Sequence, residues 1–547
     1  MKEETLRGST LPFNNKVLLM PAMPTPNGRL HLGHVAGPFM RMDILNRFIR
    51  SRGGQSLLST GVDAYESHVL LSAFKENSTP EEIANRYAKL IEDDLRAVSI
   101  DCDLFINPLA SKYSEHFHTW NRTAVDRISK SGFIRVGKEQ MPYGLESERY
   151  ITGCWIAGRC PECAAEASGY CCSNCGYHFR PEELVGARSR IETEALDWVE
   201  MNCLHLEIDD AEKLLKARPL YPDAIRKARS YLERQKSLVR LSVPGDWGVP
   251  IPVENSVDVP QVVFTYTAIG FQLMAADAYR ILGAGNHNGF ALDSDVAVVG
   301  AFGSDNVIPF LVGMQGGLVA AGFKPFDHFL INDMMSLEGK LFTTSGNNAI
   351  LVSDVIHRSG VEPDMLRYFL AKVSPESGRT DFSVGDFIQA TGELSDRWSR
   401  IEQAAENILQ VRVVSRPPQF LISRLEKALQ KQNQCLDLQK GVRIQGLPGI
   451  IDEWVELMVT HDVGETAYWW LKGLALLAFP LMPRWAQAQW VALGHDGVPR
   501  GNVFFERTLP NGVPAIKYSR VAWEQMLPSL PEGNPMQTLS EARPAGG

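Results

Sequence analysis

The feature that most constrains the fold is a short apolar strand that leads through a turn into an amphipathic helix. Residues 17–20 are all apolar, which is typical of a buried strand. Residues 24–28 contain two prolines, an asparagine and a glycine, and these residue types end a strand in a turn. From Gly33 to Ile49 apolar residues recur at helical spacing. The chain therefore begins as an α/β unit in which a strand and a turn precede a helix N-terminus.

Two histidines lie where this helix is expected to begin. His31 and His34 are three residues apart, and Gly33 stands between them. Backbone N–H groups and the positive end of the helix dipole make a helix N-terminus a natural anion site. A glycine there lets a ligand approach the backbone closely. The alternative interpretation is a tight turn with two surface histidines, and the local pattern alone does not decide between them.

The composition sets broad limits on the function. A chain of 547 residues is long enough for roughly three or four domains. The first ten residues are polar, and the most apolar stretch, residues 471–483, is too short to cross a bilayer. We therefore expect a cytoplasmic protein without membrane association. The net charge of −9 gives no nucleic-acid signature, although a local basic groove can exist on an acidic protein.

Two further strands are expected to end in a glycine and an aspartate. Residues 55–63 end in this way at Asp63, and residues 295–302 lead into Gly303 and Asp305. In open parallel sheets, the carboxyl ends of strands carry ligand-binding residues. Asp63 could hold a substrate ammonium group, and Asp305 could accept hydrogen bonds from both hydroxyls of a ribose. Helix capping is the simpler role for either carboxylate.

Five of the nine cysteines lie close together in the first half of the chain. Four of them form two C-x-x-C pairs separated by eight residues: Cys160, Cys163, Cys172 and Cys175. This spacing predicts a zinc knuckle in which four thiolates surround the metal. A site with four cysteine ligands leaves no position open for water, so the Zn²⁺ is expected to be structural. Cys171 is interpreted as a bystander, although a register with Cys171 as a ligand stays open.

These motifs, in this order, resemble those of the class I aminoacyl-tRNA synthetases, and most closely the methionyl-tRNA synthetase-like branch. Residues 31–34 are similar to the HIGH signature of the family, and residues 303–306 are similar to its ribose-binding segment. The cysteine knuckle lies where that branch carries its zinc. Residues 381–387 look like the junction before the helical domain. The similarity extends from about residue 16 to about residue 400.

The resemblance implies an α/β fold with a Rossmann-like parallel-sheet catalytic domain, an inserted zinc-knuckle domain and a C-terminal α-helical bundle. The expected divisions are the first catalytic half (1–131), the inserted domain (132–243), the second catalytic half (244–335), a KMSKS-like loop and junction (336–390), an anticodon-binding-like helical domain (391–530) and a disordered tail (531–547). Within the helical domain, three tryptophans at helical spacing are expected to belong to the core: Trp454, Trp469 and Trp470.

The resemblance also implies a reaction, in which an amino-acid carboxylate attacks the α-phosphate of ATP and the aminoacyl group is then transferred to tRNA. Mg²⁺ on the leaving phosphates is expected, in a monomer or homodimer. The catalytic residues implied are His31, His34 and Lys340. The ATP-binding residues implied are Asn27, Gly33, His34, Gly303, Asp305, Lys340 and Thr343. The amino-acid-binding residues implied are Met23, Asp63, Phe264, Phe271 and Phe310.

Three departures from the family pattern leave the substrates open. In the KMSKS-like loop, Thr343 replaces the second lysine, and the loss of one charged donor typically costs about 10²–10³ in rate. The residues that stand where the family has tyrosine, tryptophan, tyrosine and histidine in its methionine pocket are Thr25, Phe264, Phe271 and Phe310. The helical region also lacks the family's anticodon-reading pattern. The expected substrate is methionine or a related apolar amino acid. The alternatives are a paralogue with a non-tRNA acceptor and an inactive binding protein.

Overall fold

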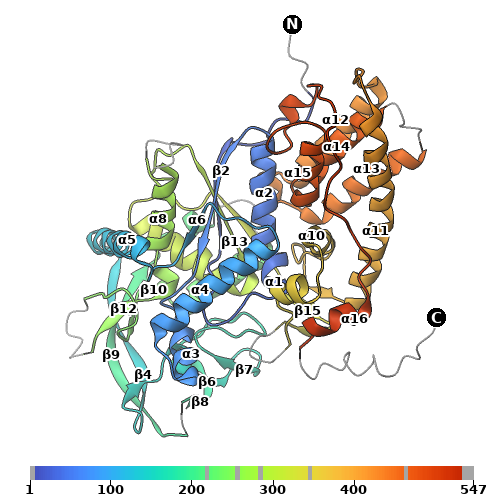
Figure 1. Ribbon diagram of the computed structural model, residues 1–547. Coiled ribbons are helices and arrows are strands. Elements are labelled where there is room, and N and C mark those ends of the chain that lie inside the picture. Colours follow the sequence, from blue (N-terminus) through green and yellow to red (C-terminus); the bar gives the residue numbers. More distant parts are fainter. Residues whose placement is uncertain are drawn as a thin grey trace.

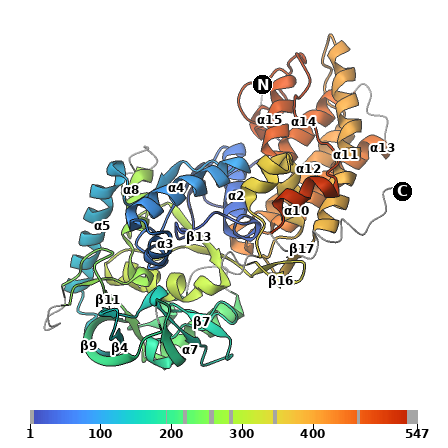
Figure 2. The ribbon, with the colours of Figure 1, turned by 60° about the horizontal axis from the view of Figure 1, so that its bottom comes forward.

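The structure is a computed structural model that describes residues 6–531, with the exception of residue 192 and of residues 216–220, 253–258, 281–286, 343–347 and 461–465. Thr343 and the expected tail lie outside the described residues. Figures 1 and 2 show a mixed α/β part that contains the first two-thirds of the chain and a helical part that contains the rest.

The centre of the α/β part is a parallel five-stranded sheet with the strand order β14-β13-β1-β2-β3. Its strands are β1 (Lys16–Pro21), β2 (Gln55–Gly61), β3 (Leu104–Ile106), β13 (Ala297–Gly303) and β14 (His328–Asn332). Alternate residues of β1 are buried on opposite faces, because Val17 and Leu19 belong to one apolar cluster and Leu18 and Met20 to another. Burial on both faces explains why the strand has an uninterrupted apolar sequence.

Helices cover both faces of this sheet (Figure 1). The first cluster contains apolar residues of α2 (Met40–Ser51) and α4 (Pro80–Ala97). The second contains residues of α5 (Ser111–Lys130) and α8 (Gly270–Tyr279). The shorter helices of this part are α1 (Leu32–His34), α3 (His68–Glu76) and α9 (Gln315–Ala320). The predicted Rossmann-like α/β core is thereby confirmed.

Between β3 and β13 the chain forms antiparallel structure, drawn in cyan and green below the central sheet in Figure 1. One sheet, with the order β10-β9-β4-β5, consists of β4 (Ile134–Gly144), β5 (Arg149–Tyr150), β9 (Leu196–Glu207) and β10 (Leu238–Arg240). A second sheet contains β6 (Ile156–Arg159), β7 (Glu166–Ser168) and β8 (Val185–Ser189). Helices α6 (Ala211–Leu214) and α7 (Pro222–Arg234) follow, and β11 (Ser242–Pro244) pairs with β12 (Gln261–Val263).

The last third of the chain is helical (Figure 2). A small sheet of β15 (Met335–Leu337), β16 (Lys340–Leu341) and β17 (Thr380–Phe382) precedes it. Its helices are α10 (Pro363–Lys372), α11 (Val384–Asn407), α12 (Gln419–Cys435), α13 (Leu447–Thr460), α14 (Ala467–Ala478), α15 (Pro483–Ala492) and α16 (Trp523–Met526). Trp454, Trp469 and Trp470 are buried, as predicted. Each indole N–H donates to a backbone carbonyl.

Arg367 of α10 joins the helical part to the α/β part. Its guanidinium is fully buried, pairs with Asp43 of α2 at 2.7 Å and donates to the carbonyls of Val98, Pro480 and Leu481. A buried charge is tolerated only when it is paired and hydrogen-bonded. This arginine therefore fixes α10 against both parts of the molecule.

The strand β12 is shorter than its sequence suggests. Residues 262–267 are rich in strand-forming types, but β12 ends at Val263 and residues 265–267 form a 3₁₀ turn. The Thr267 hydroxyl donates to the carbonyls of Arg240 and Phe264. Such local hydrogen bonds from a threonine compete with strand pairing. Throughout the part of the chain that the structure describes, no helix is both long and apolar enough to cross a membrane.

Candidate active site

Three of the predicted site residues, Met23, Asp63 and Asp305, follow the carboxyl ends of β1, β2 and β13, where the strand order of the central sheet changes direction. Ligands of open α/β sheets bind at such a reversal point. The segment after β1 is tied to both neighbouring strands. Ala22 donates its N–H to Ala301 of β13 at 2.8 Å, and Asp63, after β2, donates its N–H to the carbonyl of Pro24 at 3.1 Å.

His31 and His34 form a stacked pair at the start of α1. Their ring centroids are 3.7 Å apart with an interplanar angle of 21°. The His31 backbone N–H donates to His34 Nδ1 at 3.3 Å. Because Nδ1 of His34 accepts this bond, its Nε2 carries the proton and is the free donor. The Cβ of any larger residue at Gly33 would lie 3.1 Å from the His31 ring, so only glycine leaves this face open.

Both imidazoles are neutral near pH 7. Burial lowers the pKa of His34 to about 4. Burial, together with the neighbouring His34, lowers the pKa of His31 well below its usual value. The Nδ1 atom of His31 is buried and has no hydrogen-bond partner among the described residues. The pair therefore offers neutral N–H donors to a ligand, and the unpaired atom is available to one.

A phenylalanine lies over this pair. The ring of Phe342 stacks on His31 with a centroid distance of 5.1 Å and an angle of 10°. It also lies 3.6 Å from the position that a Cβ at Gly33 would occupy. Lys340 is two residues earlier, exposed, at the start of β16. The loop that carries these residues thus reaches the histidine pair.

Asp63 is the carboxylate nearest the end of β2. Burial, with a smaller contribution from the charge of Glu66, raises its pKa to about 7. Glu66 accepts hydrogen bonds from the backbone N–H and Nδ1 of His68, at 2.6 and 2.7 Å. Asp63 is half-buried and has no cationic partner among the described residues, so its ionised form would be stabilised by a ligand that carries an ammonium group.

Asp305 follows β13 in a 3₁₀ turn, and burial raises the pKa of its carboxyl group. Its Oδ1 lies 2.5 Å from the position of a Cβ at Gly303, so a larger residue at position 303 would displace this carboxylate. The backbone carbonyl of Asp305 accepts from His178 Nε2 at 2.9 Å, and His178 Nδ1 is 2.8 Å from the Tyr266 hydroxyl. His178 therefore connects the knuckle region to this turn.

The predicted amino-acid-binding residues have two kinds of surroundings. Met23, Phe271 and Phe310 pack in the same apolar cluster. Phe264 instead contacts two tyrosines, Tyr170 at 4.8 Å and Tyr266 at 4.5 Å between ring centroids. Asn27 is exposed in the turn before the histidines.

The four predicted zinc ligands lie together, and their Sγ atoms are all within 4.8 Å of one another. Cys160 and Cys175 are 3.8 Å apart, and Cys163 and Cys172 are 3.7 Å apart. A tetrahedron with Zn–S bonds of about 2.3 Å has S–S edges of about 3.8 Å, so the cluster fits a zinc ion. Cys171 is not a member of this cluster, because its Sγ lies near the carbonyl of Asp305, at 3.9 Å. This placement favours the register with Cys172.

Comparison with known proteins gives the family. The model of the family described as tRNA synthetases class I (M) matches residues 17–401. The chain belongs to this family. As a class I synthetase it is a ligase. A methionine–tRNA ligase of Bifidobacterium animalis subsp. lactis is 25% identical over 536 residues, which cover 88% of this chain and 84% of the relative. One from Thermoplasma volcanium is 27% identical over 393 residues, which cover 70% of this chain and 71% of the relative.

The synthetase shares its fold with a solved structure of the family. The Mycobacterium tuberculosis methionyl-tRNA synthetase bound by methionyl-adenylate superposes with a TM-score of 0.67 at 17% sequence identity, and the match covers 92% of this chain and 99% of that one. Two residues that contact the predicted site were not predicted from the sequence: Phe342 and His178. No motif marks these residues, because each acts through contacts with distant segments.

Proposed function

We propose that this synthetase activates methionine or a related apolar amino acid with ATP as an aminoacyl adenylate, and transfers the aminoacyl group to tRNA. The observation that carries the proposal is the stacked His31–His34 pair at the reversal point of the sheet, with Asp63 and Asp305 on the strands either side. The names of the relatives support the choice of methionine and tRNA.

In this proposal the side chains position the reactants and stabilise charge. The Nε2–H group of His34 donates a hydrogen bond to the nucleotide phosphates as negative charge develops on them. Asp305 accepts hydrogen bonds from the ribose hydroxyls, and Asp63 pairs with the ammonium group of the amino acid. No covalent enzyme intermediate is needed, because the substrate carboxylate is itself the nucleophile. Mg²⁺, when bound to the phosphates, would neutralise charge on the leaving pyrophosphate.

The segment that begins at Lys340 has one lysine fewer than the KMSKS pattern that the resemblance implies. Lys340 is present, but position 343 holds a threonine. If the loop closes over pyrophosphate, Thr343→Lys should increase the rate of adenylate formation, by up to about 10²-fold. Pre-steady-state measurement of adenylate formation tests this. An unchanged rate would show that the loop does not contact pyrophosphate.

The proposed function is tested by amino-acid-dependent ATP–pyrophosphate exchange across all amino acids, with and without total tRNA. We expect exchange with methionine or an apolar analogue and stable labelling of tRNA with the same amino acid. His34→Ala should reduce exchange by about 10²-fold. As a control, His116→Ala removes an exposed histidine of α5 and should leave exchange unchanged. Absence of exchange with every amino acid would refute the proposal.

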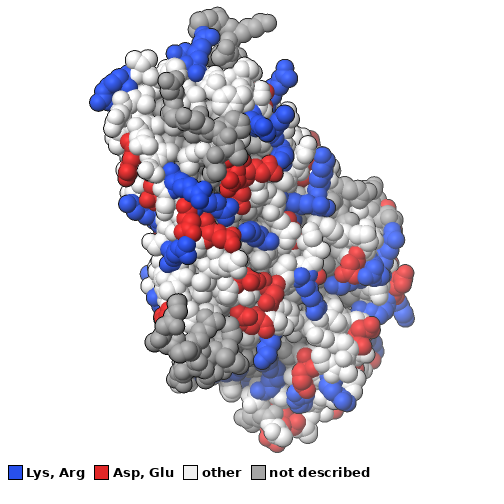
Figure 3. Space-filling model, turned by 90° about the vertical axis from the view of Figure 1, so that its right-hand side faces the viewer, with Lys and Arg blue, Asp and Glu red and all other residues white. Residues whose placement is uncertain are grey.

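A second candidate is adenylate formation followed by transfer to an amine other than tRNA. Two observations favour it. The tryptophans of the helical part that could stack on unpaired bases are buried. On the face shown in Figure 3, basic and acidic side chains are interspersed instead of forming a basic stripe. Exchange without tRNA labelling would support this candidate over the first.

A further inference from the structure

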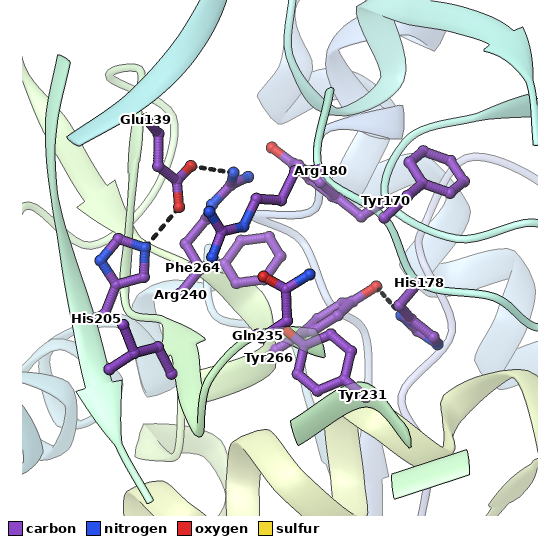
Figure 4. Close-up of a pocket in the computed structure, with 12 residues that line it drawn as sticks. Glu139, Tyr170, His178, Arg180, His205, Tyr231, Gln235, Arg240, Phe264 and Tyr266 are labelled. Atoms are coloured by element: carbon purple, nitrogen blue, oxygen red, sulfur yellow. Dashed lines mark hydrogen bonds and ion pairs between the residues drawn. The ribbon is translucent and has the colours of Figure 1, made fainter. Parts of the chain in front are cut away.

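Two turns of the proposed site are each held by a side chain from a distant segment. For the turn at Asp305 this side chain is the imidazole of His178, which also bonds to the Tyr266 hydroxyl (Figure 4). For the turn before His31 it is the carboxylate of Asp94, near the C-terminal end of α4. Asp94 lies outside the motifs that predicted the site.

Asp94 accepts three hydrogen bonds from the turn before His31. Its side chain is fully buried, and its Oδ1 accepts from Arg29 Nη2 at 2.6 Å. Its Oδ2 accepts from Arg29 Nε at 3.3 Å and from the backbone N–H of Leu30 at 3.0 Å. A bidentate arginine–carboxylate pair fixes geometry as well as adding energy. Because Leu30 directly precedes His31, the carboxylate determines where the backbone enters the histidine pair.

The same turn is joined to the segment that follows the KMSKS-like loop. His31 forms an isolated antiparallel bridge with Leu351, and the residues on either side of His31 bond to residues 350 and 352, both at 3.1 Å. These are contacts between backbone groups only. The carboxylate from α4 therefore supplies a further fixed point, from a different element.

The contact with Asp94 extends to His34 through one more hydrogen bond. The backbone N–H of His31 donates to Nδ1 of His34 at 3.3 Å, which leaves the Nε2–H group of His34 free for a ligand. The direction of that N–H group therefore depends on where the backbone of residues 30 and 31 lies. A chain of contacts runs from Asp94 through Leu30 and His31 to this donor.

We propose that Asp94 is a positioning residue for adenylate formation, and that through the backbone N–H of Leu30 it orients the Nε2–H group of His34 toward the nucleotide phosphates. This role rests on the proposed function, in which that donor faces the phosphates. Donors stabilise developing charge best when they are held in place before the reaction. A displacement of about 1 Å can cost about 100-fold in rate. Arg29 keeps the buried carboxylate paired.

The kinetic test is ATP–pyrophosphate exchange. Asp94→Ala should lower kcat about 10- to 100-fold and leave the KM for the amino acid within about twofold, because Asp63 lies on a different loop. Asp94→Asn keeps an oxygen that can accept from Leu30 and should recover most of the lost rate. As a control, Asp93→Ala removes the neighbouring carboxylate, whose side chain is 48% exposed, and should exchange like the wild type.

A double-mutant cycle shows whether Asp94 acts through His34. If it does, Asp94→Ala should cost less than about threefold in a His34→Ala background, because the donor that it orients is gone. Equal losses in both backgrounds, or a wild-type rate in Asp94→Ala, would overturn the proposal. If Asp94→Ala does not fold, Arg29→Gln gives the same comparison: it weakens the hold on the carboxylate and should lower kcat several-fold.

A measurement without any reaction separates this role from the proposed function. In nitrogen NMR spectra of protein labelled at histidine, the resonance of His34 Nδ1, assigned with His34→Ala, should move in Asp94→Ala and stay in place in Asp93→Ala. A resonance that stays in place in both variants contradicts the positioning role. If no amino acid supports exchange by the wild type, the proposed function fails, and the resonance still decides whether Asp94 positions His34.

Discussion

The raised pKa of Asp63 predicts how amino-acid activation depends on pH. Only the ionised carboxylate can pair with the substrate ammonium. With a pKa of about 7, about 9% of Asp63 is ionised at pH 6.0 and about 76% at pH 7.5. The kcat/KM for the amino acid should therefore fall about eightfold between pH 7.5 and pH 6.0. Below pH 7, a plot of log(kcat/KM) against pH should approach a slope of one.

Other groups of the site do not produce this profile. Burial keeps the pKa of His34 near 4 and that of His31 well below its usual value, so both remain neutral across the window. The charge of Glu66 raises the pKa of His68 above its ordinary value, which favours the protonated imidazole.

The assay is ATP–pyrophosphate exchange at saturating ATP, with the amino-acid concentration varied at each pH. Glu66→Gln removes the negative charge that helps to raise the pKa of Asp63, so the midpoint of the pH dependence of kcat/KM should move to lower pH. A glutamine can still accept the hydrogen bond from the His68 backbone. A kcat/KM that does not change between pH 6.0 and pH 7.5, or a midpoint unaffected by Glu66→Gln, would refute the role of Asp63 as the ammonium partner.

Three further predictions concern the knuckle, the loop and the core. Cys163→Ser should reduce bound zinc from about one ion per chain, measured by elemental analysis, whereas Cys102→Ser, outside the cluster, should not. Phe342→Ala should lower the KM for ATP about two- to tenfold, because a stack worth about 0.5–1.5 kcal/mol no longer covers His31; a raised KM would show that Phe342 instead holds the nucleotide. Arg367→Met should lower the free energy of unfolding in urea by about 1–3 kcal/mol, because buried carbonyls lose their donor while Arg47 still pairs with Asp43, and equal loss in a variant of the exposed Arg358 would contradict this.

The parts of the fold that could be predicted are those whose signal is local. The strand at residues 17–20 is continuous and apolar because both of its faces are buried, and the cysteine spacing already contains the ligand geometry. The unpredicted contacts join distant segments. Phe342 reaches His31 across some three hundred residues, and His178 reaches the carbonyl of Asp305 from the knuckle region. A periodic pattern of apolar residues indicates which side chains are buried, but not which distant residues they contact. Such contacts can be identified only in the folded structure.

His178 links the knuckle to both halves of the proposed reaction. The carbonyl of Asp305 can only accept, so Nε2 of His178 must carry the proton. Its Nδ1 is then an acceptor for the hydroxyl of Tyr266. The neutral imidazole of His178 therefore bonds both to the turn that we propose binds ribose and to Tyr266, two residues after Phe264. Cys171, beside a zinc ligand, packs against the same carbonyl. We therefore expect a zinc ion in the knuckle to affect catalysis only through position, so that its loss impairs the use of ATP and of the amino acid together.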